Sequence, residues 1–370
     1  MARPLTVVQL LPALHSGGVE RSTLEIAAAL VAAGHRSVVI SAGGRLVAPL
    51  VAAGSKHFAL DIGRKSLRAF ATMRRLREAL ARLKPDVVHA RSRLPAWLGW
   101  YALRGLPQPR PRFVTTVHGM NSPGRYSGVM LRGERVICVS GAVRDYVLAH
   151  WPGTDPARLR VVPRGVDPAQ FPRGFQASAD WQANFAAEHP ALQGGPRLLM
   201  PGRGTRLKGH ADAIELLAGL RAAGSDARLW LLGALEPGRE AYVAELEALA
   251  QARGVAHAMV ISPPRADIRE AYAACDLVLQ LSRQPEAFGR TVVEALSIGR
   301  PVLGWGQGGV GELLRELYPA GDVAPGDAAQ LLQRARALLA QPAPLPARVP
   351  YTLAAMQAAT LEIYGQLVEP

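Results

Sequence analysis

Residues 275–305 read CDLVLQLSRQPEAFGRTVVEALSIGRPVLGW, and the expected architecture follows from this stretch. The apolar runs at 275–282 and 301–305 predict two buried strands, and the residues between them predict a helix that ends at Gly299. Strand, loop, helix and strand in this order indicate a parallel α/β sheet, which binds ligands at the carboxyl ends of its strands. Glu286 lies at the expected helix mouth, and Glu294 follows about two turns later.

The two glutamates are candidates for a ligand site. A helix N-terminus offers unpaired N–H groups to a phosphorylated or polyhydroxylated ligand, and carboxylates accept hydrogen bonds from sugar hydroxyls. The pair alone is equally compatible with a helix-end charge at Glu286 and a solvated residue at Glu294. The flanking residues Ala287, Phe288 and Gly289 favour a site.

The stretch Pro285 to Glu294 resembles the E-x7-E motif of retaining glycosyltransferases of family 4. The resemblance implies an α/β fold of two Rossmann-like domains facing across a cleft (GT-B). It also implies that Glu286 and the amides of Ala287, Phe288 and Gly289 hold the donor sugar, while Glu294 holds the ribose hydroxyls of the nucleotide.

Length and composition agree with two globular domains. The chain has 370 residues, 49% hydrophobic, and a net charge of +14. No apolar run is long enough for a membrane span. Cys138 and Cys275 lie in apolar runs, which indicates buried thiols in a reducing compartment. The positive charge suits nucleic acid, anionic lipid or phosphorylated sugars.

Changes in the strand–helix pattern divide the chain into four parts. Residues 1–172 are expected to form an acceptor-binding domain, and residues 173–196 a polar linker. Residues 197–348 are expected to form the nucleotide-sugar-binding domain. The resemblance implies that the last part, an amphipathic helix in 349–370, packs back on the first domain.

The first domain contributes residues that follow its predicted strands. Gly17 and Gly18 follow the strand at 6–11, where a glycine loop is either a tight turn or a donor phosphate site. His89, Arg91 and Arg93 follow the strand at 86–88, and His118 ends the strand at 113–117. The resemblance implies that His118 orients the donor sugar and that His89, Arg91 and Arg93 face the acceptor. Two arginines suit an acidic or phosphorylated acceptor.

The second domain opens with a strand, a glycine loop and a helix, an arrangement that binds anions. Arg203 and Lys208 match the positions that hold the donor diphosphate in the resembling family, although Gly204 stands where an apolar residue is commoner. No Asp-x-Asp motif occurs, so we expect no metal or other cofactor, with charge neutralisation falling to Arg203 and Lys208. The expected catalytic residues are His118, Arg203, Lys208 and Glu286, without an enzyme nucleophile.

Residues 306–311 match the dinucleotide-binding pattern G-x-G-x-x-G. The match lies late in the chain and lacks the acidic residue that should end the next strand, so it does not indicate a dinucleotide site. We expect a glycine loop whose amides face the donor, followed by a helix starting near Gly311.

The helix expected at 65–84, together with Arg64 just before it, carries eight cations and one acid, Glu78. Its apolar stripe packs on a core, and its basic face is either solvated or rests on an anionic membrane surface. Nucleic acid is not expected as a partner, because no aromatic residues interleave with these arginines.

Together these features predict a retaining, metal-independent transferase that moves a hexose from a nucleotide-diphosphate sugar to a saccharide or glycolipid acceptor. The expected context is lipopolysaccharide core or other envelope glycan synthesis, in the cytoplasm at the inner face of the membrane. Two alternatives remain. One is a sugar-nucleotide epimerase or hydrolase of the same fold, and the other is a non-catalytic glycan- or lipid-binding protein.

Overall fold

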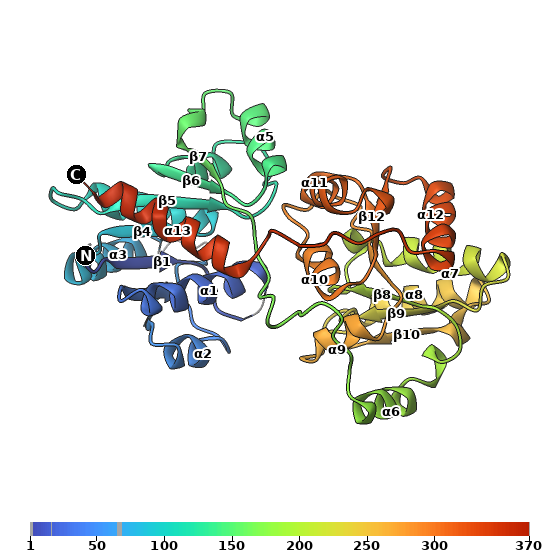
Figure 1. Ribbon diagram of the computed structural model, residues 1–370. Coiled ribbons are helices and arrows are strands. Elements are labelled where there is room, and N and C mark those ends of the chain that lie inside the picture. Colours follow the sequence, from blue (N-terminus) through green and yellow to red (C-terminus); the bar gives the residue numbers. More distant parts are fainter. Residues whose placement is uncertain (1–2, 16, 65–68, 370) are drawn as a thin grey trace. The chain divides into compact units, whose positions relative to one another are not determined.

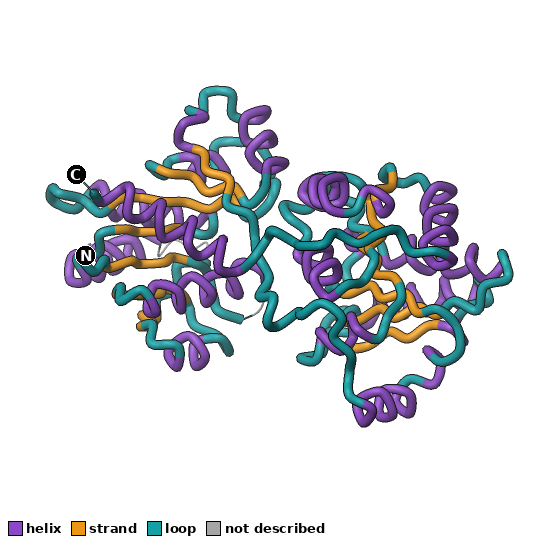
Figure 2. The backbone as a smooth tube through the Cα atoms, in the orientation of Figure 1, coloured by secondary structure: helices purple, strands orange, loops and turns teal. Residues whose placement is uncertain are grey.

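A computed structural model describes residues 3–15, 17–64 and 69–369 of the chain, which divides into two compact units (Figure 1). Unit 1 comprises Met1–Arg164 together with Leu353–Pro370, and unit 2 comprises Gly165–Thr352. Each unit is built on one parallel sheet with helices on both faces (Figure 2), so the predicted α/β class with two Rossmann-like domains is confirmed.

The sheet of unit 1 has the strand order β3-β2-β1-β4-β5-β6-β7. Its elements are β1 (Thr6–Leu10), α1 (Gly18–Ala32), β2 (Arg36–Ser41), α2 (Val47–Ala52), β3 (Lys56–Ala59), α3 (Ala69–Leu83), β4 (Val87–Ala90), α4 (Arg93–Arg104), β5 (Arg112–Val117), η1 (Ser127–Leu131), β6 (Arg135–Cys138), α5 (Gly141–His150), η2 (Pro156–Arg158), β7 (Leu159–Val161) and α13 (Leu353–Val368).

The sheet of unit 2 has the order β10-β9-β8-β11-β12-β13. Its elements are α6 (Ala179–Glu188), η3 (Pro190–Leu192), β8 (Arg197–Pro201), η4 (Arg206–Lys208), α7 (His210–Ala222), β9 (Arg228–Leu232), α8 (Glu240–Ala252), η5 (Ala256–Ala258), β10 (Met259–Ser262), α9 (Ile268–Ala273), β11 (Leu277–Gln280), α10 (Arg290–Ile298), β12 (Val302–Trp305), α11 (Gly308–Leu317), η6 (Pro319–Gly321), β13 (Asp322–Val323) and α12 (Ala328–Ala340).

The C-terminal helix α13 belongs to unit 1, as the sequence predicted (Figure 1). Its Met356 and Ile363 share one apolar cluster with Ile26 of α1 and Val87 of β4. The helix therefore packs on the sheet of unit 1, although the whole of unit 2 (Gly165–Thr352) lies between it and the other elements of unit 1 in the sequence.

Residues 173–196 differ from the expected linker, because they form part of unit 2. Trp181 in α6 donates from Nε1 to Asp267 Oδ2 at 2.6 Å and stacks on Phe185. Phe185 is 3% exposed and packs on Trp230, with ring centroids 4.8 Å apart. Burial of these aromatic rings outweighs the polar, glycine-containing composition that suggested a linker.

The basic helix is confirmed as α3 (Ala69–Leu83), although residues 65–68 lie outside the described part of the chain. Leu76 and Leu80 are fully buried, while Arg75 and Arg82 are exposed. Within the described ranges, no helix has the length and apolar composition needed to cross a bilayer.

Cys138 and Cys275 are both buried free thiols, as expected. Burial raises the pKa of each thiol to about 12, so both are unreactive at neutral pH.

Candidate active site

The residues singled out in unit 2 lie at the carboxyl ends of β8 and β11, which are neighbours in the sheet. The strand that follows β8 in sequence, β9, lies on one side of this pair, and the strand that follows β11, β12, lies on the other side. A crevice for ligands is expected at this point, where the strand order reverses. The loop after β8 carries Arg203 and Lys208, and the loop after β11 carries Glu286.

Glu286 is held by three side chains. Lys208 pairs through Nζ with Glu286 Oε1, and Ser282 donates from Oγ to the same oxygen. Gln280 donates from Nε2 to Glu286 Oε2 at 3.2 Å. The side chains of Lys208 and Glu286 are 29% and 25% exposed, so the pair stays within reach of a ligand.

Arg203 is exposed, and its guanidinium makes no hydrogen bond or ion pair within the described ranges. The neighbouring Gly204 is buried against the carbonyl oxygen of Ala234, where any Cβ would clash. This contact explains why glycine replaces the apolar residue that is commoner in the resembling family. An anion bound here could contact two cations: Arg203, whose guanidinium makes no side-chain bond within the described ranges, and Lys208, which is paired with Glu286.

Glu294 is 6% exposed, and its Oε2 accepts a hydrogen bond from the Tyr272 hydroxyl at 3.0 Å. Burial, followed by the Glu294 carboxylate, raises the pKa of Tyr272 well above its usual value, so the hydroxyl stays protonated and donates. Helix α10 begins at Arg290, four residues beyond Glu286. Glu294 therefore lies in its second turn, whereas the sequence suggested two full turns from Glu286.

The glycine-rich segment 306–311 does not form the expected loop of ligand-facing amides. Helix α11 already begins at Gly308, and the Gly309 amide donates to the Glu286 carbonyl at 2.7 Å. A Cβ on Gly309 would lie 2.5 Å from the Ala287 carbonyl oxygen and 2.6 Å from Phe288 Cα. Here the glycines allow α11 to pack directly on residues 286–288.

Phe288 and Gly289 support this segment from its other end. Phe288 is 6% exposed and packs edge-on against Tyr351, with ring centroids 5.7 Å apart. Gly289 is the N-cap residue of α10. The backbone of residues 286–289 is therefore fixed by packing on both sides.

In unit 1, His118 follows β5 and accepts a hydrogen bond at Nδ1 from Arg164 Nη2. Burial, and then the Arg164 and Arg91 guanidiniums, hold the pKa of His118 well below its usual value. The imidazole is therefore neutral at pH 7, and because Nδ1 accepts, the proton resides on Nε2. That Nε2 atom has no hydrogen-bond partner within the described ranges.

Arg91 is 3% exposed and donates from Nε to Gln9 Oε1 at 2.7 Å and from Nη1 to Ser22 Oγ at 3.1 Å. Arg93 donates from Nη1 to Ser127 Oγ at 3.3 Å. Both arginines and His118 line one pocket of about 240 Å³ at the carboxyl ends of β4 and β5.

His89 does not face this pocket, contrary to expectation. It is fully buried, and its two ring nitrogens bond to Tyr364 of α13 at 2.6 Å and to Thr116 of β5 at 2.7 Å. The side chain projects from β4 toward Tyr364 of α13. The expectation that His89 faces the acceptor is therefore wrong, and His89 is a structural residue that does not line the pocket.

Gly17 and Gly18 lie where expected, at the start of α1. Gly17 is the N-cap residue and has no side chain to cap the helix, and the carboxylate of Glu20 in the first turn lies beside it. Val19 in the same turn lines the pocket with Arg91.

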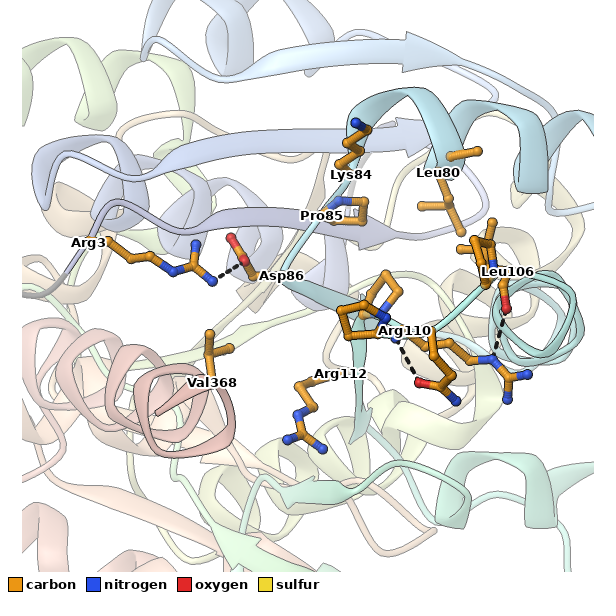
Figure 3. Close-up of a pocket in the computed structure, with 14 residues that line it drawn as sticks. Arg3, Leu80, Lys84, Pro85, Asp86, Leu106, Arg110, Arg112 and Val368 are labelled. Atoms are coloured by element: carbon orange, nitrogen blue, oxygen red, sulfur yellow. Dashed lines mark hydrogen bonds and ion pairs between the residues drawn. The ribbon is translucent and has the colours of Figure 1, made fainter. Parts of the chain in front are cut away.

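A larger pocket, of about 640 Å³, lies at the opposite, amino edge of the unit 1 sheet (Figure 3). Arg3 is directed at Asp86 there, while the charged ends of Lys84, Arg110 and Arg112 point in different directions. Cations that do not converge give no common point for an anion, so we exclude this pocket as the candidate site.

Sequence reasoning missed the residues that support the predicted ones. Tyr272, Gln280 and Ser282 hold the two glutamates, and Arg164 fixes the tautomer of His118. Arg164 lies 46 residues beyond His118 in the sequence, and no local pattern indicates the bond between them.

Two family models match the chain. The model for Glycosyltransferase Family 4 matches residues 16–170, and the model for Glycosyl transferases group 1 matches residues 182–352. Among curated proteins, the D-inositol 3-phosphate glycosyltransferase of Xylanimonas cellulosilytica is 31% identical over 245 residues, covering 61% of this chain. The chain spans 56% of that relative's length.

Two solved structures have the same fold. A glycosyltransferase from Rickettsia africae is 26% identical with a TM-score of 0.84, and the match covers 100% of both chains. Anabaena HepE in complex with UDP and glucose is 21% identical with a TM-score of 0.76, covering 98% of this chain and 100% of HepE. Residues 16–170 thus match the Glycosyltransferase Family 4 model, residues 182–352 match the Glycosyl transferases group 1 model, and the chain shares the GT-B fold of these glycosyltransferase structures.

Proposed function

We propose that the protein is a retaining, metal-independent glycosyltransferase that moves a hexose from a nucleotide-diphosphate sugar to a saccharide or glycolipid acceptor. The observation that carries the proposal is the ion pair between Lys208 and Glu286 at the reversal of strand order in unit 2, with exposed Arg203 in the same loop as Lys208. Two cations suit a diphosphate and a carboxylate suits sugar hydroxyls, which supports the proposal.

Each residue has a role that follows from its chemistry. Arg203 and Lys208 neutralise the charge that grows on the departing diphosphate, so no step requires a metal. Glu286 and the backbone at Ala287, Phe288 and Gly289 bind the sugar ring. Glu294 binds the ribose hydroxyls.

Gly17 and Gly18 supply further backbone amides for the donor. Neutral His118, which carries its proton on Nε2, donates a hydrogen bond to a sugar hydroxyl. Arg91 and Arg93 bind the acceptor.

The reaction breaks the bond between the anomeric carbon and the β-phosphate oxygen, and the acceptor oxygen bonds to that carbon on the same face. The acceptor's proton passes to the departing β-phosphate oxygen, so no enzyme nucleophile takes part. Product NMR should show the donor's anomeric configuration in the new glycoside. An inverted product, or a glycosyl-enzyme adduct trapped with a fluorinated donor, would contradict this step.

A thermal-shift panel of nucleotide diphosphates, without metal, tests the donor site. A ligand at one hundred times its Kd should stabilise the protein by about 2.7 kcal/mol. The response should collapse in Glu294→Gln and persist in the matched control Glu247→Gln, which alters an exposed glutamate of α8. If no nucleotide stabilises the wild type, the proposed activity is wrong.

We further propose that the acceptor is carried on a membrane, as in lipopolysaccharide core or other envelope glycan synthesis at the inner face of the cytoplasmic membrane. The basic face of α3 supports this, together with exposed aromatic rings on α3 and α4. Phe70 is 82% exposed and Tyr101 is 50% exposed. Basic side chains beside exposed aromatic rings suit the interface of an anionic bilayer.

Flotation with phosphatidylglycerol vesicles at low salt tests the membrane proposal. Binding should fall at least tenfold when three exposed α3 cations become glutamine: Arg74, Arg75 and Arg82. A triple change of three exposed arginines in unit 2 should leave binding unaltered: Arg206, Arg239 and Arg253. Equal losses in both variants would indicate non-specific attraction to net charge.

A further inference from the structure

The pocket of about 240 Å³ in unit 1 is lined by positively charged and neutral residues. Among the described residues, its lining contains Arg91, Arg93 and His118 but no carboxylate. The other lining residues are neutral: Val19, Ser92, Thr116, Gly119, Asn121 and Met130. A ligand entering this pocket therefore meets only positive and neutral groups.

Arg91 is a buried cation whose bonds all go to neutral groups. The Gln9 amide oxygen and the Ser22 hydroxyl accept its hydrogen bonds, the Tyr364 hydroxyl interacts with it as well, and its Nη2 has no hydrogen-bond partner within the described ranges. The nearby Glu25 already pairs with Arg21 at 3.3 Å. A buried charge without a bonded counter-ion is costly, and an anionic ligand in the adjoining pocket would offset that cost.

Helix α4 adds a second, independent contribution at the same place. Its N-cap residue Ser92 makes no side-chain capping bond, although serine is a good N-cap. The amides of Arg93 and Leu94 lack intrahelical acceptors, and Pro95 has no amide hydrogen. The N-terminus of this 12-residue helix thus opens onto the pocket that Ser92 and Arg93 line.

We infer that this pocket binds an anionic group, a phosphate or a carboxylate, on the acceptor. The identification of this ligand as the acceptor rests on the proposed function. The inference limits the acceptor to sugars that carry a negative charge. Arg93 and the α4 amides contact the anion, and Arg91 supplies its charge from behind them.

Calorimetric titrations of four ligands on the UDP-saturated protein test the inference: glucose, glucose 6-phosphate, glucose 1-phosphate and glucuronate. At least one charged sugar should bind ten times more tightly than glucose, and comparing the phosphates with glucuronate identifies the anion. Arg93→Gln, which removes the contact, and Arg91→Gln, which removes the buried charge, should each reduce this preference at least fivefold. Arg104→Gln, at the other end of α4, is the matched control and should retain it.

Lys208→Ala separates this pocket from the phosphate site in unit 2. A preference that persists in Lys208→Ala and is lost in Arg93→Gln supports the inference, whereas the reverse pattern overturns it. Equal binding of glucose and all charged sugars also overturns it and leaves the proposed activity intact if UDP still binds. Failure of the wild type to bind any nucleotide diphosphate of the thermal-shift panel contradicts the proposed activity, while the titrations repeated without nucleotide still decide the anion preference.

Discussion

The ion pair between Lys208 and Glu286 joins the two loops that follow β8 and β11. In the proposed reaction, Lys208 must attract the diphosphate, so it shares its charge between Glu286 and the donor. Gln280 donates to Oε2 of Glu286 and Ser282 donates to Oε1, and neither hydrogen bond requires Lys208. The carboxylate thus stays oriented while its cation is shared.

Replacing Lys208 by alanine should therefore lower kcat/KM for the donor by about 100-fold or more, since a charge-assisted contact to the developing phosphate charge is lost. Steady-state kinetics with varied donor concentration measure the effect. Arg206→Gln is the matched control, because Arg206 lies in the same short helix and pairs with Glu245. An equal loss in both variants would assign the effect to the fold of this turn.

Tyr272→Phe should weaken nucleotide binding roughly tenfold. The buried Glu294 carboxylate loses a hydrogen-bond donor, which costs about 1–3 kcal/mol and frees the carboxylate to rotate. Calorimetric titration of the nucleotide measures the change. Tyr318→Phe is a suitable control, because the hydroxyl of this buried tyrosine donates to the Ala343 carbonyl at 3.5 Å and to no other group in the described part of the chain. If Tyr272→Phe binds the nucleotide as tightly as the wild type, Tyr272 does not position Glu294 for binding.

At the scale of an element, α11 determines the shape of the sugar-binding segment. Glycine at the start of this helix brings its backbone against residues 286–288, and the Gly309 amide bonds to the Glu286 carbonyl. The expected glycine loop is thus the start of a helix, and its role is close packing.

Gly309→Ala should destabilise unit 2 by about 2–4 kcal/mol, because the new methyl group would overlap the backbone at Ala287 and Phe288. Gly365→Ala is the matched control in α13, where a Cβ meets nothing within 4 Å. That change should be neutral or stabilise the helix by up to about 1 kcal/mol. Urea unfolding measures both variants, and a Gly309→Ala protein as stable as the wild type would contradict the packing argument.

At the scale of the whole molecule, buried histidines in both units couple stability to pH. Burial is the main cause that lowers the pKa of His210 to about 4, and burial also lowers the pKa of His89 and His118 well below the usual value. The unfolded chain takes up these protons near pH 6.5, while the folded chain resists them. Stability is therefore complete above about pH 6.5 and falls as the pH drops toward 4.

For His210, the free energy of unfolding should fall by about 2 kcal/mol between pH 6.5 and pH 5. Each pH unit lowers it by about 1.4 kcal/mol while only the unfolded state is protonated. Urea unfolding of unit 2 at the two pH values measures the loss. His210→Gln should remove this part of the pH dependence, and exposed His257→Gln is the control. A wild-type protein equally stable at both pH values would contradict the argument.

The sequence determined the fold class and which loops carry the candidate residues. Apolar runs alternating with helical patterns leave only a parallel sheet covered on both faces, and chemistry collects at its strand ends. These signals are local, so Arg203, Lys208, Glu286 and Glu294 could be located by position along the chain. The C-terminal helix was assigned to the first domain through resemblance to a family.

Only the tertiary structure decided which side chains meet. His89 and Arg91 are two residues apart on the same strand end, yet the first is enclosed beneath Tyr364 of α13 and the second reaches the pocket. Likewise, aromatic packing of Trp181 on Phe185 gathered an apparent linker into unit 2. Such contacts join residues far apart in sequence, and their energy depends on burial, which no local pattern of residues specifies.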